Sequence, residues 1–587
     1  MPTHHRLGTS LIDLLIAIAI IALLFGGVYM VYFSIITAAT NVGARTAASE
    51  AIQNELEMIR NLSYANVGTL GGIPSGVINP TQTVAVGNFK IVLQIAILNI
   101  HDPYDTASGT VPNADYKFVT VQATCPSCAH FIPMAVTTTV APPNLQAAAQ
   151  NGGVIIINAL DANGIGVPNA TIHVVNASVT PSINLTDVTN ASGVLELIGV
   201  PTSTQGYYIS ATKGGYSFDQ TYAPGSLGGS TPVKPNITVA SQTISSVSFG
   251  IDAVSRLAVQ AETNRCVLVG GEPFTVAGSK LIGTAPAILK FSTSSLTNAS
   301  GTAAFSGLEW DTYSLALSDA GYNVAGTMPL NPVSISPSSS MAFQFVLQPA
   351  LNPSLLATIE DAASGAGITN ATVTLSKAGF SSTLSTGHAF LTQTNWSGGG
   401  QYASQSGGID DSQAGKLVLL ANASGTYPTS SVQWLVSNTF DVGGTSSTFN
   451  AIAWNPVQQP PSTGAGSLEF QVAANNDNAT WNFVGPDGTN ATYFSSGTSS
   501  LPAALAGKRY FRYEAFMSTQ DEGATPELDG ITADFTANCV PPAQALFTNL
   551  PGGTYTIDVQ AANYSEETST VTVVGGFQST TVMMTQQ

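Results

Sequence analysis

Charged side chains are scarce in this chain. Only 9% of its 587 residues are charged, and 16 Lys and Arg face 34 Asp and Glu, which gives a net charge of −18. An average soluble protein carries about 25% charged residues. Nucleic acids and anionic lipids are bound by clusters of basic residues that neutralise phosphate. The composition therefore argues against both as partners, and its acidic, Thr-rich character suits an exported protein.

Signatures of catalysis are also missing. The six His residues are scattered, and there is no nucleophile elbow, phosphate-binding Gly-rich loop or His-Glu-x-x-His motif. Glu309 and Asp311 would suit a glycosidase as an acidic pair, but both fall in a repeated strand region, where a structural role is the simpler interpretation. The sequence predicts no enzymatic activity and no cofactor.

Cysteine is sparse, with four residues in the whole chain. Cys125 and Cys128 form a Cys-Pro-Ser-Cys motif with His130 close by, which is compatible with a redox pair or a metal site. The motif lacks a second pair of ligands, so a short local disulfide in an oxidising compartment is expected. Cys266 and Cys539 fall in different expected domains, and the sequence does not predict whether they pair.

The N-terminus carries the most specific pattern that is present. A short leader ends at Gly8, Thr9 follows, and a single carboxylate stands at Asp13. Residues 14–36 then contain no charged side chain, and ~20 apolar residues at about 1.5 Å each cross the hydrocarbon core of a bilayer. An acid at the start of such a segment is costly unless it meets a positive partner. Its position therefore indicates a paired charge.

This arrangement resembles the class III signal of type IV prepilins, which pilins and pseudopilins share. In that family prepilin peptidase cleaves after the Gly, the new N-terminus is methylated, and a Glu at the fifth mature position pairs with the terminal amine of a neighbouring subunit. The resemblance implies cleavage between Gly8 and Thr9, N-methylation of Thr9, and a filament-assembly charge at Asp13. The chain departs from the family in having Thr where Phe is usual and Asp where Glu is usual.

The alternatives for this segment are an ordinary secretory signal and a plain membrane anchor. A secretory signal has its small-residue cleavage site after the apolar core. Gly8 instead precedes the core, and an acid begins it. The pattern therefore favours the pilin-like interpretation.

A long helix is expected to continue beyond the apolar segment to residue 62. Ala is frequent there, and Ile52, Leu56 and Ile59 recur at spacings of four and three, which predicts an amphipathic face. Residues 89–97 and 116–124 are expected to be strands. A long helix that covers a small sheet is the arrangement of pilins.

The rest of the chain contains an internal repeat. The repeated pattern combines an apolar strand, a turn rich in Asp, Asn and Gly, an Asn-Ala-Thr strand, a Thr-Asn-x-x-Gly turn and a Tyr strand. Copies begin near Val154, Leu257 and Leu355. Short alternating strands between regular turns predict antiparallel β-sandwiches, and a period near ~100 residues predicts a string of domains rather than a solenoid. The pattern resembles carboxypeptidase regulatory-like and collagen-adhesin B-type Ig-like domains.

The third copy is split. Its first half stops near Ser382 and its second half resumes near Cys539, which leaves about 150 residues between them, the length of a domain. Insertion into a loop is tolerated where the ends of the host stay close together. Residues 467–473 and 509–517 are expected to be strands, and the insert resembles a discoidin-type or lectin-like jelly roll.

The insert contains four of the five Trp residues and offers the candidate ligand contacts. Exposed aromatic rings stack on sugars, and jelly rolls often carry lectin sites, so Trp396, Trp434 and Trp481 are the candidates. The alternative is that these rings fill the core. Asp477 and Asp487 are candidate calcium ligands because loop carboxylates bind calcium, although solvated turn residues explain them equally well.

The sequence thus predicts a mainly β protein with one long N-terminal α-helix, in which a pilin-like α+β module precedes a string of antiparallel β-sandwiches. The expected domains are a leader (1–8), the transmembrane and pilin helix (9–65), a small pilin-like β module (66–143), sandwich 1 (144–253), sandwich 2 (254–350), a split sandwich 3 (351–382 plus 537–587) and an inserted jelly roll (383–536).

The expected function is that of a bacterial minor pilin or pseudopilin-like surface protein that presents its sandwiches for adhesion. It would be anchored in the cell membrane by a single pass or incorporated in a pilus, with its body exported. The expected partners are prepilin peptidase, other pilin subunits, the membrane and a glycan or other surface ligand. The alternatives are a pseudopilin of a type II secretion or DNA-uptake machine and a surface carbohydrate-active enzyme.

Overall fold

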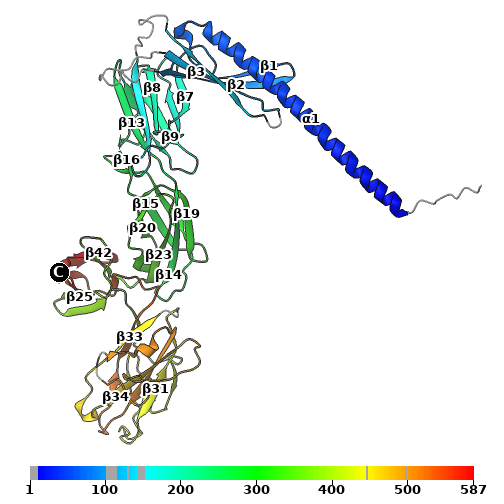
Figure 1. Cartoon of the computed structure of the whole chain (residues 1–587). Coiled ribbons are helices and arrows are strands. Elements are labelled where there is room, and N and C mark those ends of the chain that lie inside the picture. The colour runs from blue at the N-terminus through cyan, green and yellow to red at the C-terminus, as the bar shows by residue number, and fades with distance from the viewer. Residues whose placement is uncertain are drawn as a thin grey trace, which may run out of the picture. The chain divides into compact units, whose positions relative to one another are not determined.

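The computed structural model describes residues 11–100, 116–128, 131–142, 152–444, 447–495, 497 and 499–587. The side chains of residues 11–19, 22–24, 26–28, 31 and 34 lie outside this description. The protein is mainly β, with one long helix near the N-terminus and a series of largely antiparallel sheets (Figure 1). This confirms the predicted fold class. The chain divides into two compact units, the first made of Met1–Val254 and Leu281–Ile288 and the second of Ser255–Lys280 and Leu289–Gln587.

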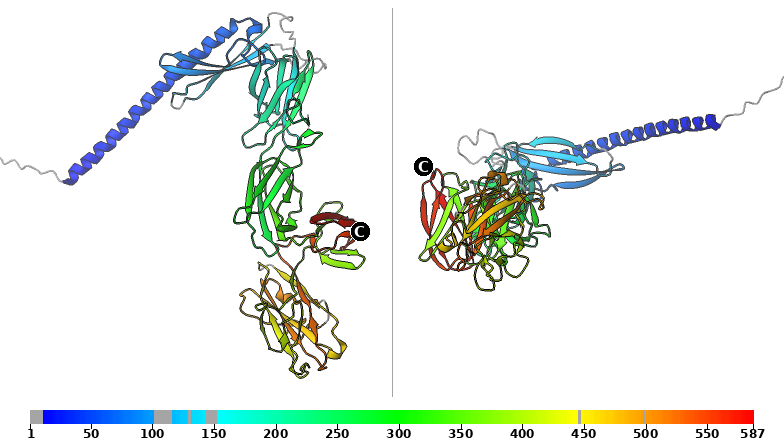
Figure 2. Two further views of the ribbon diagram at one scale, coloured as in Figure 1. Left: turned by 180° about the vertical axis from the view of Figure 1, so that it is seen from behind. Right: turned by 90° about the horizontal axis from the view of Figure 1, so that it is seen from below.

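The first unit begins with α1 (Leu11–Arg60), a continuous helix of 50 residues. No Pro interrupts it, so the apolar segment and the amphipathic segment form one rod, as expected. Across the part of the chain that the structure describes, no helix is both long and apolar enough to be a candidate membrane span. Both figures show the C-terminal half of α1 lying against a sheet and the N-terminal half extending past it (Figures 1 and 2).

A four-stranded antiparallel sheet of order β1-β2-β3-β4 packs against α1. Its elements, with the short helix that precedes them, are η1 (Tyr64–Asn66), β1 (Thr81–Val86), β2 (Phe89–Ile100), β3 (Tyr116–Thr124) and β4 (Met134–Val140). The two strands expected from the sequence are therefore confirmed, and β2 is three residues longer than expected. The contact stripe of α1 follows the spacing of a helix face, with buried Ala44, Ala48, Ile52, Leu56 and Ile59.

Sandwich 1 also belongs to the first unit. Its two sheets have the orders β13-β5-β8 and β10-β9-β6-β7, with β12 paired to β9. The strands are β5 (Gly153–Leu160), β6 (Thr171–Asn176), β7 (Ile183–Val188), β8 (Val194–Val200), β9 (Ser203–Thr212), β10 (Asp219–Gln220), β12 (Ile237–Val239) and β13 (Ile244–Gly250).

The boundary with the next sandwich differs from the expected one. The short strand β16 (Leu281–Thr284) pairs with β11 (Thr231–Pro232) of the first unit, and β17 (Ile288–Leu289) follows it in the same small sheet. Residues 281–288, expected within sandwich 2, therefore group with the first unit. The hairpin of β16 and β17 is short, and its sequence carries no signal of which sheet it will pair with.

Sandwich 2 opens the second unit. Its sheets have the orders β19-β14-β23-β21 and β18-β15-β20-β22. The strands are β14 (Ser255–Thr263), β15 (Pro273–Gly278), β18 (Ser292–Leu296), β19 (Thr302–Leu308), β20 (Asp311–Leu317), β21 (Tyr322–Met328), β22 (Val333–Ile335) and β23 (Ser340–Pro349).

Sandwich 3 is assembled from two distant parts of the chain. Its sheets have the orders β39-β24-β42 and β26-β25-β40-β41. Figure 1 shows light-green β25 and red β42 in one domain. The strands are β24 (Ser354–Asp361), β25 (Thr372–Lys377), β26 (Phe380–Ser385), β39 (Gln544–Phe547), β40 (Gly553–Gln560), β41 (Glu567–Val573) and β42 (Phe577–Met584). The first half ends at Ser385, three residues after the expected break.

A buried threonine marks where the insert enters. The hydroxyl of Thr189, which follows β7, donates to the carbonyl of Val167 and accepts from the N–H of Ala170, both in the connection between β5 and β6. Thr297 and Thr386 make the equivalent bonds in sandwiches 2 and 3. In the first two sandwiches a short turn follows this threonine, whereas in sandwich 3 the insert follows it. The insert therefore replaces the short turn that connects the two sheets of a sandwich, whose ends must lie close together.

The inserted domain is a two-sheet β structure with a smaller third sheet. The orders are β27-β38-β33-β35, then β28-β31-β36-β32 with β34 paired to β36, and β29-β30-β37. The elements are β27 (Ala389–Gln393), β28 (Tyr402–Gln405), β29 (Ile409–Asp410), β30 (Leu417–Leu419), β31 (Gln433–Ser437), β32 (Phe440–Asp441), β33 (Thr448–Asn455), η2 (Pro461–Thr463), β34 (Leu468–Asn475), β35 (Ser499–Ser500), η3 (Ala503–Leu505), β36 (Tyr510–Met517), β37 (Glu527–Leu528) and β38 (Gly530–Thr536).

Three contacts tie the domains of the second unit together where the insert leaves sandwich 3. A disulfide joins Cys266 of sandwich 2 to Cys539, which follows the last strand of the insert. The side-chain amide of Gln544 bonds both backbone groups of Thr327 in sandwich 2, at 3.0 Å and 2.9 Å. The imidazole of His388, at the start of the insert, bonds the side chain of Asn370 in sandwich 3 at 3.0 Å and the carboxylate of Asp534 in the insert at 2.7 Å. This junction is a built interface rather than a loose linker.

Candidate ligand-binding face of the inserted domain

Two of the four Trp residues of the insert belong to its core. Trp396 is 0% exposed, and its indole N–H donates to the hydroxyl of Tyr513 at 2.8 Å. The ring of Trp454 lies 4.7 Å from that of Phe470 and is also buried. Trp396 therefore cannot present its ring to a ligand, and its interpretation as a ligand contact is corrected here. An indole that is buried needs a polar partner for its N–H, which Tyr513 supplies.

Trp434 lies on the outer face of the five-stranded sheet. Along β36 the residues alternate between buried and half-buried, with Arg512, Glu514 and Phe516 on the outer side. Trp434 of β31 is directly opposite Phe516, and Glu469 of β34 is opposite Phe516 on its other side. Directly opposed residues share a face of the sheet. A row of side chains thus crosses three strands.

A third aromatic residue extends this row. The ring of Tyr493, which is 39% exposed, meets the ring of Phe516 edge to face, with 5.1 Å between centroids. Edge-to-face contact is a favoured arrangement of aromatic rings. Trp434 and Phe516 of the sheet and Tyr493 of a loop together form a partly exposed aromatic patch.

Trp481 lies at the other end of the same face. The guanidinium carbon of Arg512 is 4.5 Å from the centroid of its ring. The Arg512 Nε donates to the hydroxyl of Thr439, which donates to the side chain of Asn478. Partial burial lowers the pKa of Arg512. Because Arg512 and Phe516 are four residues apart on one strand, the two aromatic groups are about 13 Å apart along the sheet. We call Trp434, Trp481, Tyr493, Arg512 and Phe516 the aromatic face.

Two carboxylates lie on this face, Glu514 between the two aromatic groups and Glu469 beside Phe516. Glu514 is opposite Val436 on one neighbouring strand and Gln471 on the other. Burial raises the pKa of Glu514 and of Glu469. Among the described residues neither takes part in an ion pair, so both carboxylates remain available as hydrogen-bond acceptors. Rings for stacking beside acceptors for hydroxyl groups are the features that recognise a sugar surface.

The two candidate calcium ligands each close their own turn. The Oδ1 atom of Asp477 accepts from the N–H groups of Ala479 and Thr480, and these bonds lower the pKa of Asp477 to about 2. Asp487 accepts from the hydroxyls of Thr489 and Thr492, and its pKa is also lowered. Within the described ranges, no group of three or more His, Cys, Asp or Glu is placed to hold a metal ion.

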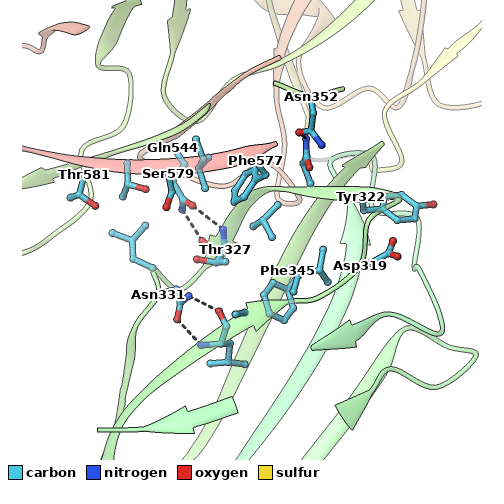
Figure 3. Close-up of a pocket in the computed structure, with 18 of the residues that line it drawn as sticks. Asp319, Tyr322, Thr327, Asn331, Phe345, Asn352, Gln544, Phe577, Ser579 and Thr581 are labelled. Atoms are coloured by element: carbon cyan, nitrogen blue, oxygen red, sulfur yellow. Dashed lines mark hydrogen bonds between the residues drawn. The ribbon is translucent and has the colours of Figure 1, made fainter. Parts of the chain in front are cut away.

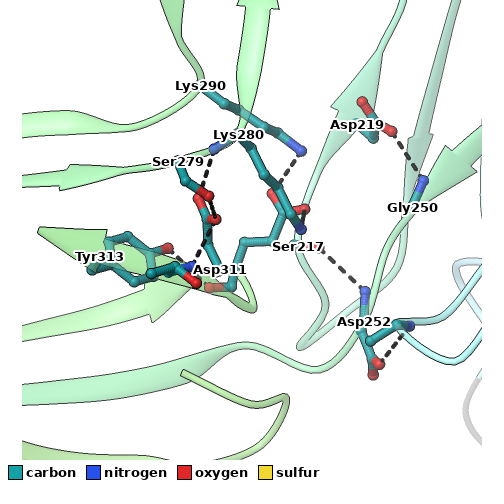
Figure 4. A network of polar contacts seen from close by, with 12 residues as sticks. Ser217, Asp219, Gly250, Asp252, Ser279, Lys280, Lys290, Asp311 and Tyr313 are labelled. Carbon is teal, nitrogen blue, oxygen red and sulfur yellow. Dashed lines mark hydrogen bonds and ion pairs between the residues drawn. The ribbon is translucent and has the colours of Figure 1, made fainter. Parts of the chain in front are cut away.

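The acidic pair of sandwich 2 is held by neighbouring groups. Glu309 receives the ammonium groups of Lys280 and Lys290, both at 2.6 Å. Asp311 accepts from the Ser279 hydroxyl at 2.6 Å and from the backbone N–H of Lys280 at 3.1 Å (Figure 4). In this arrangement the carboxylates tie residues that follow β15 and β17 to the start of β20, which is a structural task.

The remaining candidate residues lie in the first unit. Cys125 and Cys128 are joined by a disulfide beside the core between α1 and its sheet. Asp13 lies within α1, but its side chain is among those not described. Gly8 and Thr9 lie outside the described residues.

Sequence reasoning missed Arg512, Glu514 and Tyr493 as members of a candidate site. The alternation along residues 510–517 carries the signal for the first two, because period-two spacing places Arg512, Glu514 and Phe516 on one face. Tyr493 stands in a loop and has no periodic signal. Only the fold brings it to the sheet.

No protein-family model matches this sequence, and no curated protein matches it. Among solved structures, the TIE protein of Bacillus anthracis aligns at 10% identity over 87% of this chain and 73% of that chain, with a TM-score of 0.15. The minor pilin GBS52 of Streptococcus agalactiae aligns at 13% identity over 34% and 97%, with a TM-score of 0.17. A streptococcal ancillary pilin aligns at 10% identity over 45% and 80%, with a TM-score of 0.18. These scores are too low for the alignments to carry an argument about this chain.

Proposed function

We propose that this protein is a minor pilin-like or pseudopilin-like surface protein of a bacterium. Prepilin peptidase cleaves it after Gly8, the apolar start of α1 anchors it in the membrane or packs it in a filament with other pilin subunits, and the body is exported. The sandwiches act as a spacer, and the aromatic face of the insert contacts a glycan or another surface ligand. The protein performs no catalysis and needs no cofactor.

The continuous helix α1 is the observation that carries this proposal. Its second half packs its apolar stripe on a small antiparallel sheet, and its first half carries the uncharged sequence of residues 14–36. A helix of 50 residues is about 75 Å long, at about 1.5 Å per residue. The proposal assigns two tasks to this one rod: its first half inserts into the membrane or the filament core, and its second half carries the folded module.

The N-terminus of the mature protein tests the processing step. The full chain would be expressed in cells with and without prepilin peptidase and analysed by mass spectrometry. We expect a mature N-terminus at methylated Thr9 when the peptidase is present, and an unprocessed chain when it is absent or when Gly8 is changed to Val. A native protein that still begins at Met1, or that is cut after residue 36, contradicts the proposal.

Asp13 tests the assembly step separately. An ion pair with the terminal amine of a neighbouring subunit strengthens as the local dielectric falls. Asp13→Asn should therefore leave cleavage intact and reduce incorporation into filaments at least tenfold, as measured by immunoblotting of sheared surface fractions. Asp13→Glu is the matched control and should assemble at least as well as the wild type. Equal incorporation of Asp13→Asn would remove the paired charge from the mechanism.

The adhesive step rests on the aromatic face. Loss of a stacking ring costs about 1 kcal/mol or more, so Trp434→Ala should weaken binding of the full chain to a glycan array by about fivefold to tenfold. Phe218→Ala, which changes a 45% exposed ring of sandwich 1, is the matched control. If deletion of the gene abolishes secretion or DNA uptake but leaves attachment intact, the pseudopilin alternative is favoured instead.

A further inference from the structure

A second concave site lies in the second unit, between sandwich 2 and sandwich 3. It is a pocket of about 540 Å³, and none of the residues of the aromatic face lines it (Figure 3). Small-molecule sites typically have volumes of roughly 300–1,000 Å³. Strands β20, β21 and β23 form the wall from sandwich 2, and β24, β39 and β42 form the wall from sandwich 3.

The wall from sandwich 2 is mainly apolar. Leu315 and Leu317 of β20, Val324 of β21 and Phe345 of β23 all line the pocket. Phe345 is 1% exposed, so the pocket reaches the core of the sandwich. This wall offers carbon surface to a ligand.

The wall from sandwich 3 carries a ladder of hydroxyl groups. Thr358 of β24 is in register with Thr581 of the parallel strand β42, and Ser579 lies two residues before Thr581 on the same face. All three line the pocket. Within the described part of the chain, none of these hydroxyls makes a hydrogen bond. They are therefore available to a ligand.

Two side-chain amides fix the shape of the pocket but do not contribute free groups to it. Asn331 bonds both backbone groups of Leu315, at 3.0 Å and 2.7 Å. Gln544 does the same for Thr327, across the two sandwiches (Figure 3). Each amide makes the pair of backbone hydrogen bonds that a neighbouring strand would otherwise make, Asn331 on β20 and Gln544 on β21. The bonds of Gln544 hold the two walls at a set separation before any ligand binds, which reduces the ordering cost of binding.

The charge of the lining narrows the ligand class. No Lys, Arg or His lines the pocket, and Asp319 is its one charged residue. A phosphate or carboxylate ligand would find no cation to pair with, and burial of an unpaired charge is costly. A purely apolar ligand, such as an acyl chain, would leave the hydroxyl groups of Thr358, Ser579 and Thr581 without hydrogen-bond partners. At the rim, the ring of Phe577 is 38% exposed and faces the pocket from β42 (Figure 3).

We propose that this pocket binds a neutral carbohydrate of one or two pyranose rings. A pyranose presents a face of C–H groups, which suits the apolar wall and the Phe577 ring, and an edge of hydroxyls, which suits Thr358, Ser579 and Thr581. The carboxylate of Asp319 is a further acceptor for a sugar hydroxyl. This site is independent of the aromatic face and does not require that the chain be a pilin.

Saturation-transfer difference NMR on the full chain in detergent tests the proposal. The probes are the neutral disaccharides cellobiose, maltose, lactose and N,N′-diacetylchitobiose, with glucuronate as a charged comparison. We expect at least one neutral disaccharide to bind and glucuronate to give no signal. The double variant Thr358→Val and Thr581→Val keeps the shape of both side chains and removes two hydroxyls, and it should raise the Kd about tenfold or more. Phe577→Leu should raise it about threefold to tenfold.

Three controls keep the outcome specific to the pocket. Thr570→Val changes an exposed threonine of β41 in the same sandwich, and it should leave the Kd unchanged. Phe218→Leu is the matched control for Phe577→Leu, and Trp434→Ala tests whether the signal comes from the aromatic face instead. The proposal is overturned if no neutral disaccharide binds, if glucuronate binds equally well, or if the pocket variants bind like the wild type. It is also overturned if the signal is lost in Trp434→Ala.

Discussion

A single buried hydroxyl is used three times in this protein. Thr189, Thr297 and Thr386 each bond a carbonyl and an N–H of the segment that leads into the second strand of their sandwich, and each is at most 3% exposed. A buried backbone group that loses its partner costs about 1–3 kcal/mol. The repeated sandwich therefore depends on the hydroxyl at this position rather than on the size of the side chain.

Replacement of this hydroxyl tests that dependence. Thr386→Val preserves the shape of the side chain and removes both bonds, so it should lower the free energy of unfolding of sandwich 3 by about 1–3 kcal/mol. Thr374→Val, in an exposed pair with Thr383, is the matched control and should change it by less than about 0.5 kcal/mol. Urea denaturation of the full chain measures both. Equal effects of the two variants would assign the threonine no structural role.

Lys117 gives the first unit a pH dependence. Its side chain is 2% exposed, and its ammonium group donates to the carbonyls of Tyr64 and Val67. Burial lowers the pKa of Lys117 to about 8. Between about pH 8 and pH 10.4, the usual pKa of Lys, the unfolded chain therefore holds a proton that the folded chain has released. The free energy of unfolding must then rise with pH across this range.

The comparison of Lys117→Met with the wild type isolates this effect. The difference in the free energy of unfolding between the two proteins should shift in favour of the wild type as the pH rises from 8 to 10.4. Other groups that titrate in this range are present in both proteins and cancel. Denaturation at several pH values measures the difference, and parallel profiles would contradict the lowered pKa.

At the scale of elements, the helix depends on small residues. Ala44, Ala48 and Ala51 are buried where α1 crosses its sheet, and a larger side chain there would force the helix away. Ala48→Leu should therefore cost about 1–3 kcal/mol of stability through overpacking. Thr46→Leu changes an exposed position two residues away and should be nearly neutral. The rate of cleavage by trypsin on the C-terminal side of Arg60 measures how readily the helix detaches from the sheet. Equal protection of the two variants would argue against tight packing.

The sequence predicted elements well where a period was present. The apolar strands near Val154, Leu257 and Leu355 appear as β5, β14 and β24, and the helix ends within two residues of the expected position. Residues that depend on distant partners were not predictable. Trp396 stands in a Gly-rich loop whose pattern does not distinguish core from surface, and it is buried by residues distant in sequence, among them Tyr513, more than a hundred residues away.

The break in sandwich 3 was placed three residues early for a similar reason. The threonine that closes this sandwich, Thr386, has the insert after it instead of the Asn-x-x-Gly turn that marks its two counterparts. The pairing of Cys266 with Cys539 was also beyond sequence reasoning, because the two are 273 residues apart in different domains. The end of the first half of sandwich 3 and the pairing of the two cysteines both depend on where the insert is connected to sandwich 3.

At the scale of the whole molecule, the covalent structure of the second unit is a closed loop. The Cys266–Cys539 bond shortcuts the chain through most of sandwich 2, the first half of sandwich 3 and the complete insert. Pulling the oxidised protein between its termini in single-molecule force spectroscopy should leave roughly 900–1,000 Å of contour length hidden, at ~3.3–3.6 Å per residue. Reduction, or the variant Cys539→Ser, should release it. An oxidised chain that extends to its full length would disprove the loop.

This bond also decides how tension is shared when the insert holds a ligand. Force applied at the aromatic face is transmitted along the chain through β38 to Cys539, a few residues later, and across the disulfide to Cys266. Sandwich 3 then lies outside the path along which the force is transmitted. Sandwich 3 is built from two separate segments of chain, and force applied to both segments would pull them apart. The disulfide therefore protects this domain from unfolding under tension.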